Sequence, residues 1–166
     1  MELGLENTPK QIKQIYLDYA AATPVDARVL SAMQPYFTEK FYNPSASYLP
    51  AKHIGEEYEA RKAVLANSIG AKSPDLVITA GATESINLAF TVLRNFQSAH
   101  CLILETEHAA VRESAKNLSS DYEKIKVDRS GLIDLGDLKS KIKDNTVLVS
   151  VALANNELGT IQPLSD

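Results

Sequence analysis

The chain has 166 residues, of which 45% are hydrophobic and 23% are charged, and its net charge is −4. This size and balance suit one soluble globular domain, and an acidic chain without a basic stripe argues against nucleic-acid binding. The single cysteine excludes an internal disulfide and a cysteine-rich metal site, and no apolar run approaches the ~20 residues of a membrane span.

The N-terminal part of the chain alternates short apolar runs with loops. We expect a polar arm at residues 1–14, which is neither a signal nor a transit peptide, and a domain at residues 15–166. A strand at residues 15–17 should lead into a run of small residues closed by Pro24, which is either a plain turn or a loop against a ligand. Helices are expected at residues 25–36 and 51–69.

Strands and helices alternate through the rest of the chain. The pattern predicts strands at residues 75–79, 101–104, 122–127 and 146–153, and helices at residues 85–93, 109–118 and 134–142. Such alternation is typical of an α/β domain with a largely parallel sheet. Ligands of these sheets lie beyond the carboxyl ends of the strands. Three predicted strand ends carry small or polar residues, at 80–85, 106–108 and 155–157, so we expect these segments to converge at one edge.

The stretch LVITAGATESINLAF, residues 76–90, is the strongest single pattern. It begins as a strand, turns at Gly81 and continues as a helix. Free N–H groups and hydroxyls at such a helix start form a natural phosphate site, and the helix dipole adds about 0.3–1 kcal/mol. An ordinary strand-turn-helix capped by Thr83 explains the same spacing, so the pattern alone leaves both interpretations open.

Five motifs occur in order with plausible spacing, namely IYLDYAAATPVDARV, FYNPSAS, ITAGATESINLAF, ETEHAAV and VALANNELGTIQP. Together they resemble the N-terminal part of the cysteine desulfurases, the NifS/IscS-like group of pyridoxal-phosphate (PLP) enzymes in aminotransferase class V. The resemblance implies an α/β fold, PLP-dependent transferase fold type I, truncated inside its large domain.

The resemblance also implies roles for individual residues. Ala82 and Thr83 should contact the PLP phosphate, and His108 should stack on the cofactor ring as a catalytic residue that moves protons. Asn156 should bind both the cofactor and the substrate carboxylate, and Asn43 should border the substrate pocket. Without the resemblance, His108 reads as a solvent-exposed histidine at a helix start, and Asn155 as a turn residue.

Other parts of the family pattern are missing. The lysine that carries PLP and the cysteine that accepts sulfur lie on later family segments, so catalysis by the isolated chain is an open question, and we do not expect it to link PLP covalently. Cys101 lies within an apolar strand, where a thiol is usually inert. No metal site is expected.

Three hypotheses follow for the function. The chain is the N-terminal part of a PLP-dependent cysteine desulfurase, which converts L-cysteine to L-alanine and an enzyme persulfide for iron–sulfur clusters or thio-modification. It could equally be a selenocysteine lyase or other class V enzyme, or a non-catalytic binding or assembly module of the same fold. A dehydrogenase is excluded, because no G-x-G-x-x-G follows a strand. The expected partners are L-cysteine, a second copy in a homodimer, the missing C-terminal half and a sulfur-acceptor or scaffold protein. The expected location is the cytoplasm.

Overall fold

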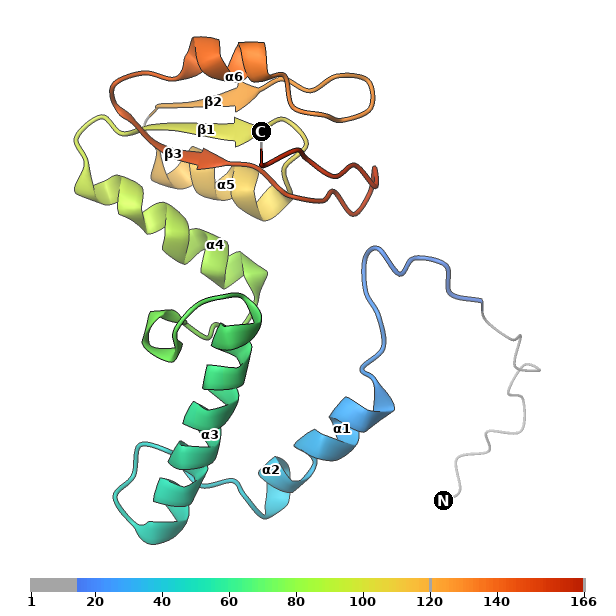
Figure 1. Cartoon of the computed structure of the whole chain (residues 1–166), viewed down its shortest axis with the longest axis vertical. Coiled ribbons are helices and arrows are strands. Elements are labelled where there is room, and N and C mark those ends of the chain that lie inside the picture. The colour runs from blue at the N-terminus through green and yellow to red at the C-terminus, as the bar shows by residue number, and fades with distance from the viewer. Residues whose placement is uncertain (1–14, 120, 166) are drawn as a thin grey trace, which may run out of the picture. The chain divides into compact units, whose positions relative to one another are not determined.

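The computed structural model describes residues 15–119 and 121–165, so the arm predicted at residues 1–14 lies outside the described residues. The chain divides into two compact units, one ending at Asn43 and the other beginning at Pro44. In the first unit, α1 (Ala27–Met33) and α2 (Pro35–Thr38) occupy the predicted helix at residues 25–36 (Figure 1). Asp26 caps α1, because its carboxylate accepts a 2.8 Å hydrogen bond from the backbone N–H of Arg28.

The second unit begins with the long helix α3 (Leu49–Ser68), followed by the short 3-10 helix η1 (Ser73–Asp75). This confirms the helix predicted at residues 51–69. Gly70 follows the C-cap Ile69 and stops the helix, because its φ of +71° lies in the left-handed region that glycine adopts without steric cost.

A three-stranded parallel sheet forms the centre of the second unit. It contains β1 (His100–Leu104), β2 (Asp121–Ile125) and β3 (Thr146–Ser150), in the order β2-β1-β3. Both neighbours pair with β1 in parallel. This confirms the predicted α/β class and the prediction of an outer strand near residues 122–127.

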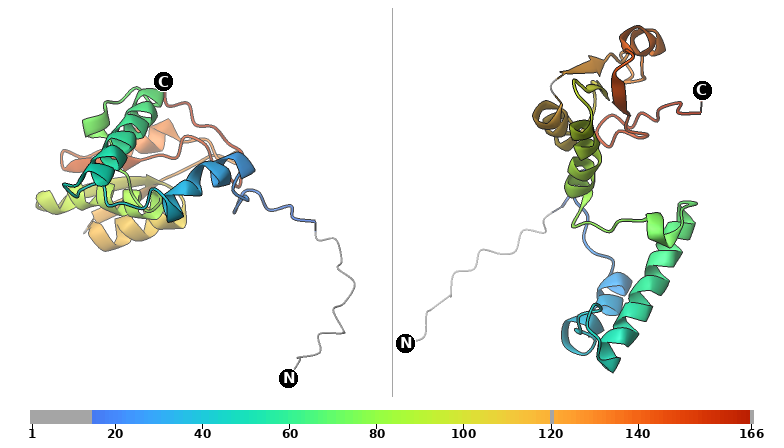
Figure 2. Two further views of the ribbon diagram at one scale, coloured as in Figure 1. Left: turned by 90° about the horizontal axis from the view of Figure 1, so that it is seen from below. Right: turned by 90° about the vertical axis from the view of Figure 1, so that its left-hand side faces the viewer.

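Helices cover both faces of the sheet. Alternate side chains of β1 point to opposite faces, so Cys101 and Ile103 pack toward α4 (Ala82–Phe90), the 3-10 helix η2 (Thr91–Asn95) and α5 (Ala109–Leu118). Leu102 and Leu104 pack on the other face, toward α6 (Leu135–Lys141). Figure 2 shows the resulting helix–sheet–helix layers. All five β1 residues are buried, which explains the apolar run that follows His100 in this strand.

Two predicted strands are wrong, and one helix begins earlier than predicted. Residues 15–17 and 75–79 form no strand, and most of their apolar side chains are exposed, as at Leu17 (86%) and Val77 (65%). A strand needs a neighbour for its N–H and C=O groups, and none of the described residues pairs with these segments. The helix predicted from residue 85 begins at Ala82, so Thr83 lies inside its first turn and is not its cap.

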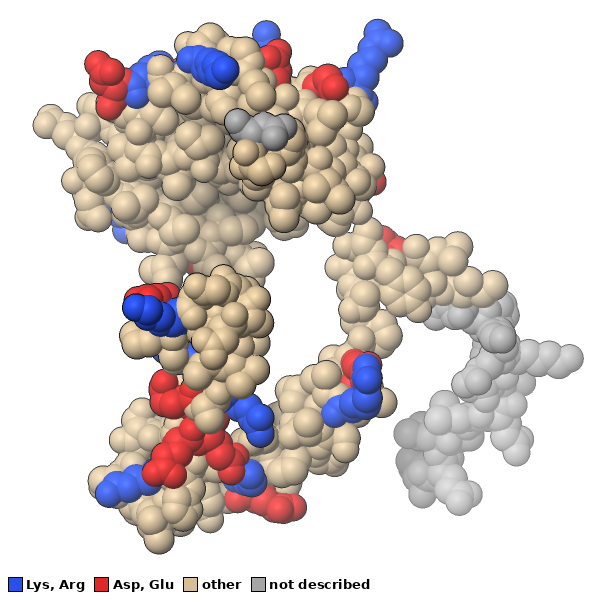
Figure 3. Space-filling model, in the orientation of Figure 1, with Lys and Arg blue, Asp and Glu red and all other residues tan. Residues whose placement is uncertain are grey.

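The surface of the described residues carries both charge signs. Figure 3 shows Lys and Arg interspersed with Asp and Glu on the face in view, without a continuous basic stripe among the described residues. Among the residues described, every helix is too short or too polar to cross a lipid bilayer.

Candidate functional site

The sheet topology places a crevice at the carboxyl ends of β1 and β3. The chain leaves β1 for β2 on one side and then crosses to β3 on the other side of β1. Loops that follow two such neighbouring strands diverge, and the gap between them is where open α/β sheets bind ligands. Here those loops are residues 105–108 after β1 and residues 151–159 after β3.

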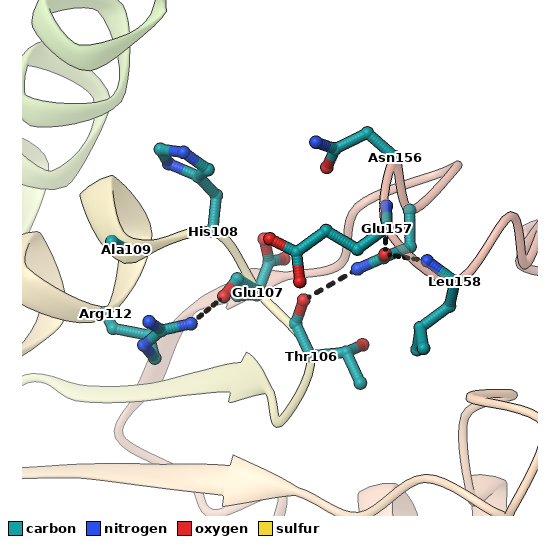
Figure 4. Close-up of a pocket in the computed structure, with 9 residues that line it drawn as sticks. Thr106, Glu107, His108, Ala109, Arg112, Asn156, Glu157 and Leu158 are labelled. Carbon is teal, nitrogen blue, oxygen red and sulfur yellow. Dashed lines mark hydrogen bonds between the residues drawn. The ribbon is translucent and has the colours of Figure 1, made fainter. Parts of the chain in front are cut away.

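A cavity of about 390 Å³ lies between these two loops. It is lined by Thr106, Glu107, His108, Ala109, Arg112, Asn155, Asn156, Glu157 and Leu158 (Figure 4). Its volume lies within the range of about 300–1,000 Å³ that small-molecule sites occupy.

Asn155 holds the two loops together. Its side-chain N–H donates to the backbone oxygen of Thr106 at 3.0 Å, and its side-chain oxygen accepts from the backbone N–H groups of Glu157 (2.9 Å) and Leu158 (2.8 Å). The latter two bonds form an Asx turn, which confirms Asn155 as a turn residue. They also fix the backbone that presents Asn156, whose side chain Figure 4 shows at the cavity.

A buried carboxylate lies in the wall of this cavity. Glu107 is 3% exposed, and its side chain accepts a 3.0 Å hydrogen bond from the hydroxyl of Ser150 on β3. Its backbone oxygen accepts from the guanidinium of Arg112, one turn into α5. Glu107 and Arg112 therefore attach the β1 loop to both β3 and α5, which fixes the position of His108 between them.

His108 is the N-cap of α5, and its ring nitrogen Nδ1 accepts a 3.1 Å hydrogen bond from the backbone N–H of Ala110. It is exposed, as the interpretation without the resemblance expects. It also lines a second cavity of about 410 Å³, with Thr83 and Asn87 of α4 and Ser114 of α5 among the other lining residues. His108 therefore lines both cavities.

The start of α4 carries hydrogen-bond donors beside this second cavity, which Thr83 lines. Gly81 caps the helix without a side-chain bond, so the N–H groups of the first turn, from Ala82 to Glu84, have no acceptor inside the helix. The carboxylate of Glu84 in the first turn accepts a 2.7 Å hydrogen bond from the N–H of Ala80, just before the helix. A Cβ built on Gly81 would meet nothing within 4 Å, so the helix start is open. This donor set fits a phosphate dianion.

The structure brings together most of the residues predicted for the site. Thr83 and His108 line one cavity, and His108 and Asn156 line the other. Ala82 is exposed at the first position of α4, and among the described residues it lines neither cavity. Asn43 belongs to the other compact unit, where it is exposed, and its role stays a prediction.

Two residues of the site were missed from the sequence. Arg112 lies four positions after His108, a spacing that places both on one side of a helix, so this residue could have been found. Glu107 carries no such signal, because nothing in the polar run ETEH distinguishes its buried carboxylate from the exposed Glu105.

Cys101 is fully buried, and burial raises the pKa of its thiol to about 11. At pH 8 the thiolate fraction is then about 10⁻³, against about a quarter for an ordinary thiol. We expect iodoacetamide to alkylate the folded chain at least about a hundredfold more slowly than the chain in urea, as followed by intact mass. Equal alkylation rates would contradict the burial of this thiol.

The raised pKa of Cys101 also makes the stability of the fold depend on pH. Folding favours the neutral thiol, so the contribution of Cys101 to the free energy of unfolding is full below about pH 9 and declines toward pH 11.

Comparisons with known proteins agree with this geometry. A family profile described as Aminotransferase class-V matches residues 15–166. The chain is 41% identical over 159 residues to the cysteine desulfurase IscS of Rickettsia massiliae, which covers 92% of this chain and 39% of that protein. The chain thus spans about two fifths of the length of the curated relatives it matches.

Solved structures show the same similarity. A NifS-like protein superposes with a TM-score of 0.87 at 34% identity, covering 92% of this chain and 43% of that one. SspA, solved in complex with cysteine, gives a TM-score of 0.82 at 34% identity, covering 90% of this chain and 45% of that one.

Proposed function

The chain belongs to the aminotransferase class V family, and from this premise we propose that it is the N-terminal part of a PLP-dependent cysteine desulfurase. Its fold is that of the NifS-like proteins, PLP-dependent transferase fold type I. In the proposed reaction, L-cysteine gives L-alanine and its sulfur passes to an enzyme cysteine as a persulfide. The bound cofactor supplies an electron sink for the bonds at the substrate α-carbon.

Three residues that line the two cavities have a part in this proposal. The N–H groups at the start of α4 and the hydroxyl of Thr83 would hold the cofactor phosphate. His108 would contact the cofactor ring and would move protons at its imidazole nitrogens. Asn156 would donate a neutral hydrogen bond to the cofactor or to the substrate carboxylate.

The observation that carries this proposal is the shared position of His108. One imidazole lines both the cavity that contains Thr83 and the cavity that contains Asn156. A phosphorylated planar cofactor needs an anion site, a ring contact and an amide donor in sequence, and the residues proposed for these roles line two cavities that share His108. The proposed anion site is at the start of α4, the proposed ring contact is the N-cap of α5 and the proposed amide is in the loop after β3.

The proposal also covers the substrate, the fate of the sulfur, the oligomeric state and the cellular location. L-cysteine is preferred to selenocysteine, because one close structural neighbour was solved with cysteine. The fate of the sulfur is iron–sulfur cluster assembly or thio-modification, through an acceptor or scaffold protein. We also propose a homodimer, supported by the many exposed large apolar side chains. A cytoplasmic location is proposed because a persulfide-forming thiol requires a reducing compartment.

A chimera tests the proposal directly. Residues 15–166 would replace the matching segment of the Rickettsia massiliae relative, which supplies the rest of a class V enzyme. We expect the purified chimera to retain PLP, followed by its absorbance, and to release L-alanine from L-cysteine. A folded chimera that retains PLP but forms alanine only from a different amino acid would contradict the desulfurase assignment and leave the family assignment intact.

Thr83 provides a sharper test of the anion site. In the chimera, Thr83→Ala removes one hydroxyl donor to a charged group, which is worth about 1.5–3 kcal/mol, so PLP should dissociate at least about tenfold more readily. Thr83→Ser keeps the hydroxyl and should behave as the parent. Equilibrium dialysis against dilute PLP measures both. Equal retention in the two variants would remove Thr83 from the phosphate site.

A further inference from the structure

Three metal-ligand side chains gather at the amino ends of β1 and β2. His100 begins β1 and lies opposite Asp121, which begins β2, in the parallel register. Glu123 follows two residues later, so its side chain shares the face of Asp121. One ligand atom from each of these three residues lies within 4.8 Å of the other two.

His100 points an unused nitrogen into this cluster. The residue is 0% exposed, and its Nδ1 atom forms a 2.8 Å hydrogen bond with the hydroxyl of Thr146 on β3. Its Nε2 atom forms no hydrogen bond with the described residues and lies 3.3 Å from a carboxylate oxygen of Glu123, a contact that is an ion pair only when the ring is protonated. With a neutral ring whose Nε2 carries a lone pair, this buried nitrogen has no partner, which is unfavourable, so a cation bound there would complete the interaction.

A lysine ammonium lies between the two carboxylates and offsets part of their negative charge. The Nζ atom of Lys143 lies 2.6 Å from an oxygen of Glu123 and 3.4 Å from an oxygen of Asp121. Its hydrogen bond lowers the pKa of Glu123, while Glu123 in turn raises the pKa of Lys143. The side chain of Lys143 is 44% exposed, so it can swing into solvent and vacate the position for another cation.

We propose that His100, Asp121 and Glu123 form a binding site for a divalent transition-metal ion such as Zn²⁺, from which Lys143 is displaced. Zinc binds imidazole nitrogen and carboxylate oxygen at about 2.0–2.2 Å, and two ligands of a tetrahedral ion are then about 3.4 Å apart. The 3.3 Å between Nε2 of His100 and the Glu123 oxygen matches this spacing. Water completes the fourth position, because both carboxylates reach the surface.

Thr146 supports this site in the way that outer-shell residues support metal-bound histidines. A histidine ligand generally forms a hydrogen bond through its other ring nitrogen, which fixes the tautomer and the ring orientation. The bond between Nδ1 of His100 and the Thr146 hydroxyl provides this contact and adds β3 to the assembly. The ion would therefore connect β1 and β2 directly, and β3 through Thr146.

This metal site is independent of the PLP site. It lies at the amino ends of the strands, whereas the two cavities lie at their carboxyl ends. Five strand residues separate the two edges, which corresponds to about 16 Å. The ion thus stabilises the sheet and takes no part in the proposed desulfurase chemistry, so neither proposal depends on the other.

Zinc titration of the full chain, purified without a histidine tag, tests the site. We expect calorimetry to give one Zn²⁺ per chain. Lys143→Met should tighten binding about tenfold, because it removes a like charge from a partly exposed site. Thr146→Val should weaken binding about 10–100-fold, and Glu123→Gln should weaken it about a hundredfold or more because a ligand is lost.

Matched controls separate this site from incidental binding. His53→Gln and Glu56→Gln change an exposed histidine and an exposed carboxylate on α3 and should leave the zinc affinity unchanged. Co²⁺ should give the strong visible absorption of a tetrahedral ion in the parent and in Lys143→Met, but not in Glu123→Gln. Circular dichroism establishes that each variant is folded. Equal zinc affinity in the parent, Lys143→Met and Glu123→Gln would overturn the proposal, as would loss of binding in His53→Gln.

Discussion

Alanine in place of His108 is expected to lower the rate of L-alanine formation by the chimera about 10²–10⁴-fold. Removal of a group that transfers protons in the transition state typically has an effect of this size. The same change also removes an aromatic contact with the cofactor, worth about 0.5–1.5 kcal/mol. The measurement is kcat for L-cysteine, with PLP retention followed by absorbance in the same samples.

A second substitution separates the two proposed roles of His108. Phenylalanine keeps a flat aromatic ring at this position but carries no proton, so His108→Phe should retain PLP more firmly than His108→Ala while remaining as slow. The control is His53→Ala on α3, which removes an exposed histidine remote from either cavity in sequence. A His108→Ala chimera that turns over at the parental rate would exclude His108 from proton transfer.

Alanine in place of Ile103 should destabilise the chain by about 2–5 kcal/mol, the usual range for a buried Ile→Ala change. Ile103 is 0% exposed, lies at the centre of the sheet and packs in the cluster shared with α4 and α5. Single domains commonly have only about 5–15 kcal/mol of stability, so this change would remove a large share of the free energy of unfolding. Urea denaturation followed by circular dichroism measures the change.

Two controls calibrate the Ile103 measurement. Ile103→Val removes one methyl group and should cost about 0.5–1.5 kcal/mol. Ile15→Ala changes an isoleucine that is 76% exposed and should fall within about ±0.5 kcal/mol of the parent. A loss below about 1 kcal/mol for Ile103→Ala would mean that the sheet centre is less closely packed than described.

The sequence predicted those helices and strands whose pattern of buried and exposed residues can be recognised within a short stretch of the chain. The helix expected at residues 109–118 is α5 with the same bounds, because Val111 and Ala115 recur on one buried face. The strand expected at residues 101–104 differs from β1 only by His100 at its start. The segments expected at the carboxyl ends of β1 and β3 indeed meet, since parallel topology alone brings them to one edge.

The errors have a common physical cause. Apolar runs at residues 15–17 and 76–79 reveal a tendency toward burial but do not identify the neighbour that a strand requires. The same limit hid the cluster at His100, because its ligands come from two strands and meet only through their register. Glu107 was missed for a related reason, since its burial depends on Ser150 across the sheet.

Because His108 caps α5, protonation of its imidazole affects the stability of the first turn of that helix. A neutral imidazole that accepts at Nδ1 carries its only proton at Nε2. When a second proton arrives at Nδ1, the lone pair that holds the N–H of Ala110 is consumed, and the helix loses a cap of the kind worth about 0.5–2 kcal/mol. Each protonation and deprotonation of His108 would then break and re-form this hydrogen bond. Fraying of the first turn of α5 would therefore depend on whether Nδ1 of His108 carries a proton.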